Sequence, residues 1–190
     1  MKAAILCGSS RPGNNTLRVC KALARTFEER GIDTNLVDFQ QYDMPFFNED
    51  DVALEHLTDF QQELIQTWTD ARIVVIVSPE YNWFPSAELV NMVHQLGSRT
   101  FQHLFDNKVF AFGGVSTGRG GRLPGMQMSS VIEKLVSHLG KYSICSPLKF
   151  ESHYSAEELD ETGNYLKQSP YKHHLERFVD YTLTLSAKFQ

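Results

Sequence analysis

The pattern of apolar and polar positions switches repeatedly along the chain between short continuous runs and helical spacing. Five short runs predict strands, at residues 2–7, 32–38, 72–77, 109–115 and Tyr142–Cys145. Elsewhere apolar residues recur every three or four positions, which predicts one helix beginning at Asn14 or Asn15 and others over residues 57–68, 85–96, 123–139 and 175–189. The run from Arg72 to Val77 is continuous and β-branched, as in a central strand buried on both faces.

This alternation predicts an α/β fold, with a single doubly wound five-stranded parallel sheet and helices on both faces. Five strands favour the order 2-1-3-4-5, in which the ligand crevice lies beyond the carboxyl ends of the first, third and fourth strands. A chain of 190 residues suffices for one such core, so we expect residues 1–190 to form a single domain. The polar, acid-rich stretch 151–170 is expected to be an excursion, with a helical turn around Glu157–Leu159.

Charge and composition argue against several classes of protein. The 18 Lys and Arg and the 23 Asp and Glu are spread without a basic block, which disfavours nucleic acid and anionic membranes as partners. No apolar run approaches the roughly 20 residues that span a bilayer, and we expect a cytoplasmic protein. Cys7, Cys20 and Cys145 are far apart and form no CxxC, so we expect free, mostly buried thiols and no zinc site.

The loop after the first strand, GSSRPGNNT at residues 8–16, is rich in small hydrogen-bond donors and leads into a helix. Backbone N–H groups at a helix start attract anions, and the guanidinium of Arg11 suits a phosphate group. Asn14 and Asn15 stand where a Walker A motif requires Lys and Ser or Thr, and GxGxxG is missing, which disfavours a P-loop nucleotidase and a Rossmann dinucleotide site. The alternative is a capped turn that binds nothing.

Two further loops follow the third and fourth strands. SPEYNWFP at residues 78–85 combines two prolines with aromatic rings, and this rigid, flat surface suits a heterocycle such as an isoalloxazine. GGVSTGRGG at residues 113–121 allows the backbone to approach a planar ring closely. Taken singly, the first is also compatible with an ordinary interface or core loop, and the second with a flexible lid or a plain turn.

Together, in order and spacing, these three segments resemble the signature segments of the NADPH-dependent FMN reductase family. The resemblance extends from Lys2 to about Gly140 and includes PFFNED at residues 45–50. It implies a flavodoxin-like fold, FMN as cofactor, NAD(P)H as co-substrate, a small-molecule electron acceptor, and assembly as a homodimer or homotetramer. At two positions the chain departs from the family pattern, where Val90 replaces a common Lys and His94 a common Asp.

The resemblance also implies which residues contact FMN. Those around its phosphate are Ser9, Arg11, Asn15 and Thr16, with Asn14 at a position where the family usually has Ser. Those bordering the isoalloxazine are Pro79, Glu80, Tyr81 and Asn82, with Ser116, Gly118 and Gly121 approaching from the third loop. Because the cofactor carries the redox chemistry, we predict no catalytic side chain and no metal ligand. A proton donor at His94 and a metal pair at His173 and His174 are disfavoured.

The function implied is hydride transfer from a nicotinamide to bound FMN and on to a small acceptor, which is a quinone, a free flavin, an azo compound or a metal oxyanion. Two alternatives share the FMN site. One is a flavodoxin-type electron carrier for protein partners, although such carriers are generally more acidic than a pI near 5.8. The other is a flavin-binding regulatory or interaction module without turnover.

Overall fold

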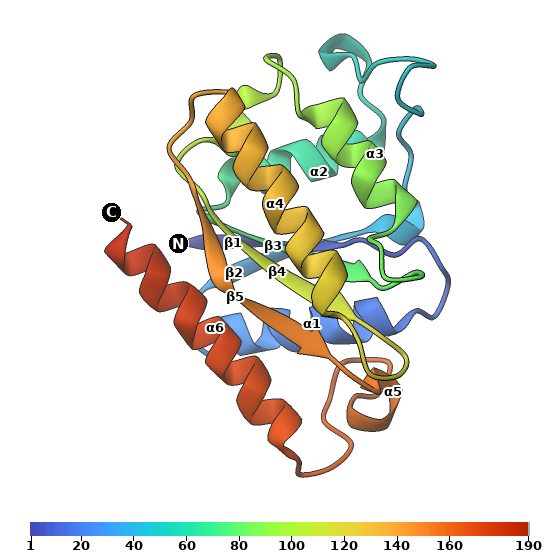
Figure 1. The fold of residues 1–190 in the computed structure, drawn as a ribbon, viewed down its shortest axis with the longest axis vertical. Coiled ribbons are helices and arrows are strands. Elements are labelled where there is room, and N and C mark those ends of the chain that lie inside the picture. The colour runs from blue at the N-terminus through green and yellow to red at the C-terminus, as the bar shows by residue number, and fades with distance from the viewer. Residues whose placement is uncertain (190) are drawn as a thin grey trace.

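Five parallel strands form one sheet in the order β2-β1-β3-β4-β5 in the computed structural model, which describes residues 1–189 (Figure 1). Every neighbouring pair of strands is parallel. The strands are β1 (Lys2–Cys7), β2 (Asp33–Asp38), β3 (Ile73–Pro79), β4 (Val109–Val115) and β5 (Ile144–Ser152). The predicted fold class and strand order are therefore confirmed.

Helices cover both faces of this sheet (Figure 1). They are α1 (Asn15–Glu28), α2 (Asp59–Asp70), α3 (Ala87–Leu96), α4 (Arg122–His138), α5 (Ser155–Glu158) and α6 (Pro170–Lys188). Three short 3-10 segments, η1 (Phe39–Gln41), η2 (Leu54–His56) and η3 (Gln102–Phe105), lie in the connections. Within residues 1–189 no helix has the length and hydrophobicity needed to cross a membrane.

The period of two along each strand divides the core into two clusters, one on each face of the sheet. On β3, Val74 and Ile76 pack with α2, α3 and α4, whereas Val75 and Val77 pack with α1 and α6. All four are almost fully buried, which explains why the run looks continuous in the sequence instead of alternating. Because helices cover both faces of the sheet, a ligand site on the sheet is expected at the ends of the strands.

Local capping sets where the helices begin. The side chain of Asn14 accepts the N–H of Leu17 at 2.7 Å, so α1 starts at Asn15. The prediction placed the start of the third helix at Pro85, two residues too early. The reason is that Ser86 is the cap of α3 and accepts the N–H of Leu89.

The fifth strand differs from its prediction over Tyr142–Cys145, because β5 runs from Ile144 to Ser152. Residues 110 and 112 of β4 pair with residues 145 and 149 of β5, so β5 carries a bulge that contains Pro147. An edge strand has one hydrogen-bonded neighbour, and it therefore tolerates a proline and a lysine that a central strand would not. Because these positions are polar or bulged, the hydrophobic pattern of the sequence does not predict the full length of β5.

The stretch 151–170, which was predicted to be an excursion, packs against α1 through its own backbone. Its helical turn, α5, lies slightly earlier than expected, at Ser155–Glu158. Arg18 donates to the carbonyl of Leu159, and Arg25 donates to the carbonyl of Gly163. Gly163, at φ 79°, sits so close to α1 that a Cβ would lie 2.7 Å from the backbone nitrogen of Ala22. Arg18 also lies 3.8 Å from Glu161, so cations of α1 hold this stretch through both main-chain and side-chain oxygens.

Candidate functional site

The loops that follow β1, β3 and β4 meet at the carboxyl edge of the sheet (Figure 1). They enclose a cavity of about 240 Å³. Eight of the twelve predicted FMN contacts line it: Ser9, Arg11, Asn14, Asn15, Thr16, Pro79, Glu80 and Tyr81. The fold thus brings together residues separated by more than sixty positions, at the crevice where doubly wound folds bind ligands.

The other four predicted residues, Asn82, Ser116, Gly118 and Gly121, do not line this cavity. Four residues that the sequence reasoning did not select do line it: Pro12, Gly13, Val115 and Thr117. In extended chain, alternate side chains face the same side, and Val115 and Thr117 follow this period of two. The alternation at the end of β4 was therefore a signal that could have identified them.

The first loop presents donors to the cavity and contains no acidic residue of its own. The first turn of α1 contains no acidic residue, and among the described residues the N–H groups of Asn15 and Thr16 make no hydrogen bond. These are the two donors that a helix leaves free behind its cap. The guanidinium of Arg11 lies 4.3 Å from the centroid of the Tyr81 ring, which holds its positive charge at the cavity.

Asn14 and Ser9 shape this loop through hydrogen bonds of their own. The amide nitrogen of Asn14 donates to the carbonyl of Arg11 at 2.7 Å, while its oxygen caps α1. The hydroxyl of Ser9 lies 3.1 Å from the hydroxyl of Tyr81. This donor set, with free helix amides and one fixed guanidinium, fits the phosphate monoester of FMN.

The second loop is a tight hairpin turn at the edge of the cavity. The N–H of Tyr81 donates to the carbonyl of Phe84, and that of Phe84 donates to the carbonyl of Tyr81, both at 3.0 Å. The two central residues, Asn82 and Trp83, have φ of 49° and 67°. This left-handed pair is the geometry of a type I′ turn, which usually contains Asn followed by Gly. Trp83 takes the glycine position and is 67% exposed, so its ring projects from the turn.

Replacing Trp83 with glycine should therefore stabilise the free protein. A non-glycine residue in the left-handed region costs about 1 to 3 kcal/mol, and glycine loses part of this gain through the greater entropy of the unfolded chain. We expect a net gain of about 1 kcal/mol, which raises Tm by about 2 to 4 °C in a protein of this size. Differential scanning calorimetry measures it. Trp83→Ala is the control, because it removes the ring but keeps a Cβ; equal Tm values for the two variants would contradict the prediction.

The third loop is held to the second loop by its backbone. The N–H of Glu80 donates to the carbonyl of Val115 at 2.8 Å, and a carboxylate oxygen of Glu80 accepts the N–H of Gly121 at 2.8 Å. Gly121 caps α4 at φ 86° and packs directly against Gly114. Gly121 therefore serves the closure of the loop, and no Cβ fits at either glycine.

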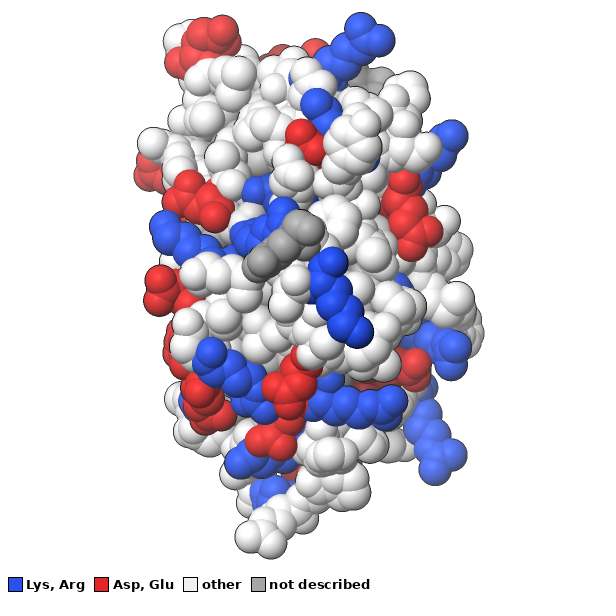
Figure 2. Space-filling view, turned by 90° about the vertical axis from the view of Figure 1, so that its left-hand side faces the viewer, with Lys and Arg blue, Asp and Glu red and all other residues white. Residues whose placement is uncertain are grey.

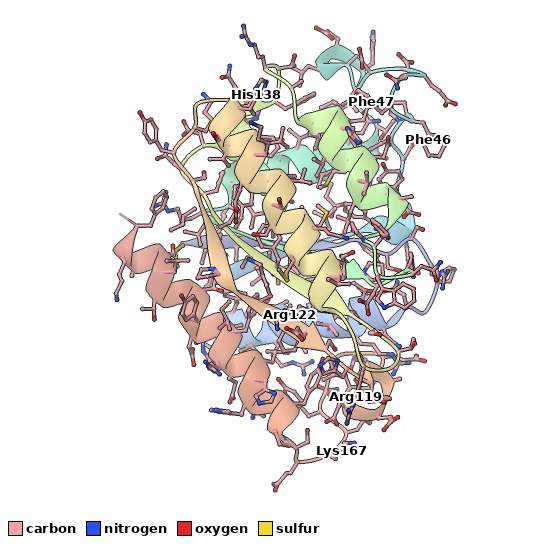
Figure 3. All side chains as sticks on the ribbon, viewed as in Figure 1. Phe46, Phe47, Arg119, Arg122, His138 and Lys167 are labelled. Atoms are coloured by element: carbon pink, nitrogen blue, oxygen red, sulfur yellow. The ribbon has the colours of Figure 1, made fainter. Side chains whose placement is uncertain are left out.

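A larger cavity of about 510 Å³ lies elsewhere, between α4 and β5. Its cations are already paired within the protein, since Lys149 Nζ donates to Ser129 Oγ at 2.9 Å and Arg122 lies 3.9 Å from Glu151. Burial lowers the pKa of Lys149. Figure 3 shows Arg122 at the first turn of α4 and Arg119 on the loop before it. Because the N–H groups of Asn15 and Thr16 make no hydrogen bond among the described residues, the smaller cavity is the better ligand site.

Other residues considered from the sequence lie outside the site. His94 does not line the cavity, and its ring stacks on Phe47 with centroids 4.9 Å apart. Within residues 1–189, no group of three or more His, Cys, Asp or Glu side chains has the geometry of a metal site. All three cysteines are free, and burial raises the pKa of the Cys145 thiol to about 12. On the face drawn in Figure 2, acidic and basic side chains are interspersed.

A parallel sheet in the order 2-1-3-4-5, with a donor-rich crevice at its carboxyl edge, defines a flavodoxin-like protein. Residues 1–139 match the family described as NADPH-dependent FMN reductase, and the chain belongs to this family. The family resemblance found in the sequence is thereby confirmed.

Three similar proteins illustrate the relationship. The NAD(P)H-dependent FMN reductase LOT6 of Saccharomyces cerevisiae is 32% identical over 114 residues, which cover 50% of this chain and 58% of the yeast protein. The match thus spans little more than half of that relative. FerB of Paracoccus denitrificans, a flavoenzyme NAD(P)H:(acceptor) oxidoreductase, superposes with a TM-score of 0.76 at 20% identity and covers 98% of this chain and 97% of its own. An archaeal flavodoxin gives 0.55 at 14% identity, with 100% and 99% covered.

Proposed function

We propose that this protein is an FMN-dependent NAD(P)H oxidoreductase, which passes hydride from a nicotinamide to bound FMN and on to a small acceptor. The observation that carries this proposal is the cavity at the carboxyl edge of the sheet, where free N–H groups of α1 and the Arg11 guanidinium face a rigid aromatic loop. Family membership supports the same reaction. The acceptor classes we propose are a quinone, a free flavin, an azo compound or a metal oxyanion.

In this proposal each loop has a separate task. The first loop binds the phosphate, through Arg11, Ser9, Thr16 and the amides of residues 15 and 16, while Asn14 keeps the loop in shape. The second and third loops border the isoalloxazine with Pro79, Glu80, Tyr81 and Asn82 and with Ser116, Gly118 and Gly121. When bound, FMN supplies the hydride chemistry, so the protein needs no side-chain base or nucleophile. The chain orients the ring and limits the access of water to it.

The rival is a flavodoxin-type carrier, which exchanges electrons with protein partners. An archaeal flavodoxin shares the fold of this chain, but FerB superposes on the chain more closely, with a TM-score of 0.76 against 0.55. The pI near 5.8 also favours the reductase, because carriers of that type are generally far more acidic. We therefore keep the reductase as the proposal.

We also propose a cytoplasmic homodimer or homotetramer. Large apolar side chains remain exposed on α3, on α4 and on the loops beside them: Phe46, Phe47, Trp83, Phe84, Val90, Met126 and Val131. Figure 3 shows Phe46 and Phe47 on the outer side of the molecule near α3. Exposed apolar patches on a soluble chain commonly mark protein contacts. Sedimentation equilibrium of the holoprotein measures the number of subunits.

The decisive experiment mixes purified, FMN-loaded protein with NADPH or NADH in the absence of oxygen. Rapid bleaching of the flavin absorbance, and its return when a quinone is added, is the expected result. No response to either nucleotide, together with light-driven reduction that stops after one electron, would establish the carrier instead. A colourless protein that takes up no FMN at micromolar concentration would refute every flavin-based function.

A further inference from the structure

Two consecutive backbone amides of the third loop are held by side chains from different segments. The N–H of Gly121 donates to Glu80 Oε2 at 2.8 Å, and the N–H of Gly120 donates to His153 Nδ1 at 3.1 Å. Glu80 lies in the family-matched region, whereas His153 lies beyond residue 139, where the family match ends. The His153 imidazole therefore holds the third loop from a position outside the family motifs.

The position of His153 is itself well determined. The preceding residue, Ser152, is fully buried, and its hydroxyl lies 2.6 Å from Ser155 Oγ and 2.6 Å from the Tyr171 hydroxyl. The carbonyl of Ser152 also accepts the N–H of Ser116 at 3.0 Å, which ties the end of β5 to the start of the third loop. These bonds fix the end of β5, and the imidazole that follows it accepts the Gly120 N–H.

The direction of the hydrogen bond determines the protonation state of the ring. Because Nδ1 accepts the Gly120 N–H, it carries no proton, and the neutral imidazole has its hydrogen on Nε2. The ring nitrogen that faces Gly120 is therefore an acceptor, which a phenyl ring at this position would not supply.

We propose that His153 is a positioning residue for FMN, which holds the loop Ser116–Gly121 in its binding form by accepting the Gly120 N–H. The inference rests on the proposed function, in which this loop borders the isoalloxazine. It assigns the loop a second side-chain support: loss of the bond to Gly120 leaves Glu80 as the side chain still holding this turn, and weakens FMN binding.

Groups of both signs surround His153 and are part of its electrostatic environment. They are Lys149 and Glu151 on β5, His174 and Arg177 on α6, Glu80 after β3, and Arg119 on the loop itself, with the tyrosines at 154 and 171 alongside. His174 is the other imidazole of this region. His174→Asn therefore serves as the control that removes this ring and keeps His153.

Two substitutions separate the acceptor from the ring. His153→Asn places an amide oxygen where Nδ1 was, and that oxygen does not titrate. His153→Phe keeps a planar ring but offers no acceptor. A neutral hydrogen bond contributes enough to change affinity by about 3- to 10-fold. We therefore expect His153→Phe to weaken FMN binding by this factor at pH 8, and His153→Asn to bind like the wild type.

The two variants together isolate the acceptor from the packing of the side chain. The Kd of His153→Phe should exceed that of His153→Asn by about 3- to 10-fold, because only the asparagine offers an acceptor to Gly120. His174→Asn should keep the wild-type Kd.

Two measurements are needed. Quenching of FMN fluorescence on adding apoprotein yields Kd, and amide hydrogen exchange at Gly120 in the apoprotein reports the hydrogen bond without any flavin. Wild-type affinity in His153→Phe, or an affinity in His153→Asn as low as in His153→Phe, would overturn the role of His153 alone. If the wild type binds no FMN, the proposed function fails and this inference falls with it.

Discussion

Replacing Gly114 with alanine is expected to destabilise the protein by about 3 kcal/mol or more, near or above the upper end of ordinary overpacking. A Cβ at this position would lie 1.7 Å from the carbonyl oxygen of Gly121. That oxygen belongs to the backbone and cannot rotate away like a side chain. In a protein of this size the loss corresponds to a decrease in Tm of roughly 6 to 12 °C, measured by calorimetry.

The neighbouring glycine supplies a matched control. A Cβ at Gly113 would lie 3.4 Å from Val77 Cγ1, which is ordinary contact, although Gly113 is on the same strand. Gly113→Ala should therefore change the free energy of unfolding far less than Gly114→Ala. Equal Tm values for the two variants would show that the approach of Gly114 to Gly121 does not constrain the third loop.

The second large effect is expected for Arg11→Ala, which should weaken FMN binding by roughly tenfold to a hundredfold. A charge-assisted hydrogen bond contributes about 1.5 to 3 kcal/mol, which corresponds to this range. The structure gives a reason to expect a loss of FMN affinity in the upper part of this range. The Arg11 guanidinium is already held over the Tyr81 ring, so little side-chain entropy is lost when a phosphate binds. Isothermal titration of apoprotein with FMN measures the change.

Two controls separate the phosphate contact from a general loss of charge. Arg99→Ala removes an exposed arginine beyond the end of α3, away from the cavity, and should leave FMN affinity unchanged. Riboflavin, which lacks the phosphate, should lose much less affinity than FMN in Arg11→Ala. Unchanged FMN affinity in this variant would remove Arg11 from the site, and equal losses for both flavins would place it near the ring instead.

The sequence alone determined the layers of this protein and the place of its site. The run from Ile73 to Val77 is apolar at every position because both faces of β3 are covered, and this property is visible without coordinates. The loop from Gly8 to Thr16 shows its donors directly, since its chemistry is local. Strand order and the convergence of three loops then follow from the general rules of parallel sheets.

Only the tertiary structure decided how the loops are closed and supported. The hydrophobic pattern did not predict the full length of β5, because a bulged edge strand has no uniform burial. Four of the predicted FMN contacts do not line the cavity. The contact of Gly114 with Gly121 and the bond from Gly120 to His153 join positions whose spacing follows no period. Periodicity reports which face of an element is buried, whereas these contacts depend on the register and curvature of neighbouring segments, which exist only once the chain has folded.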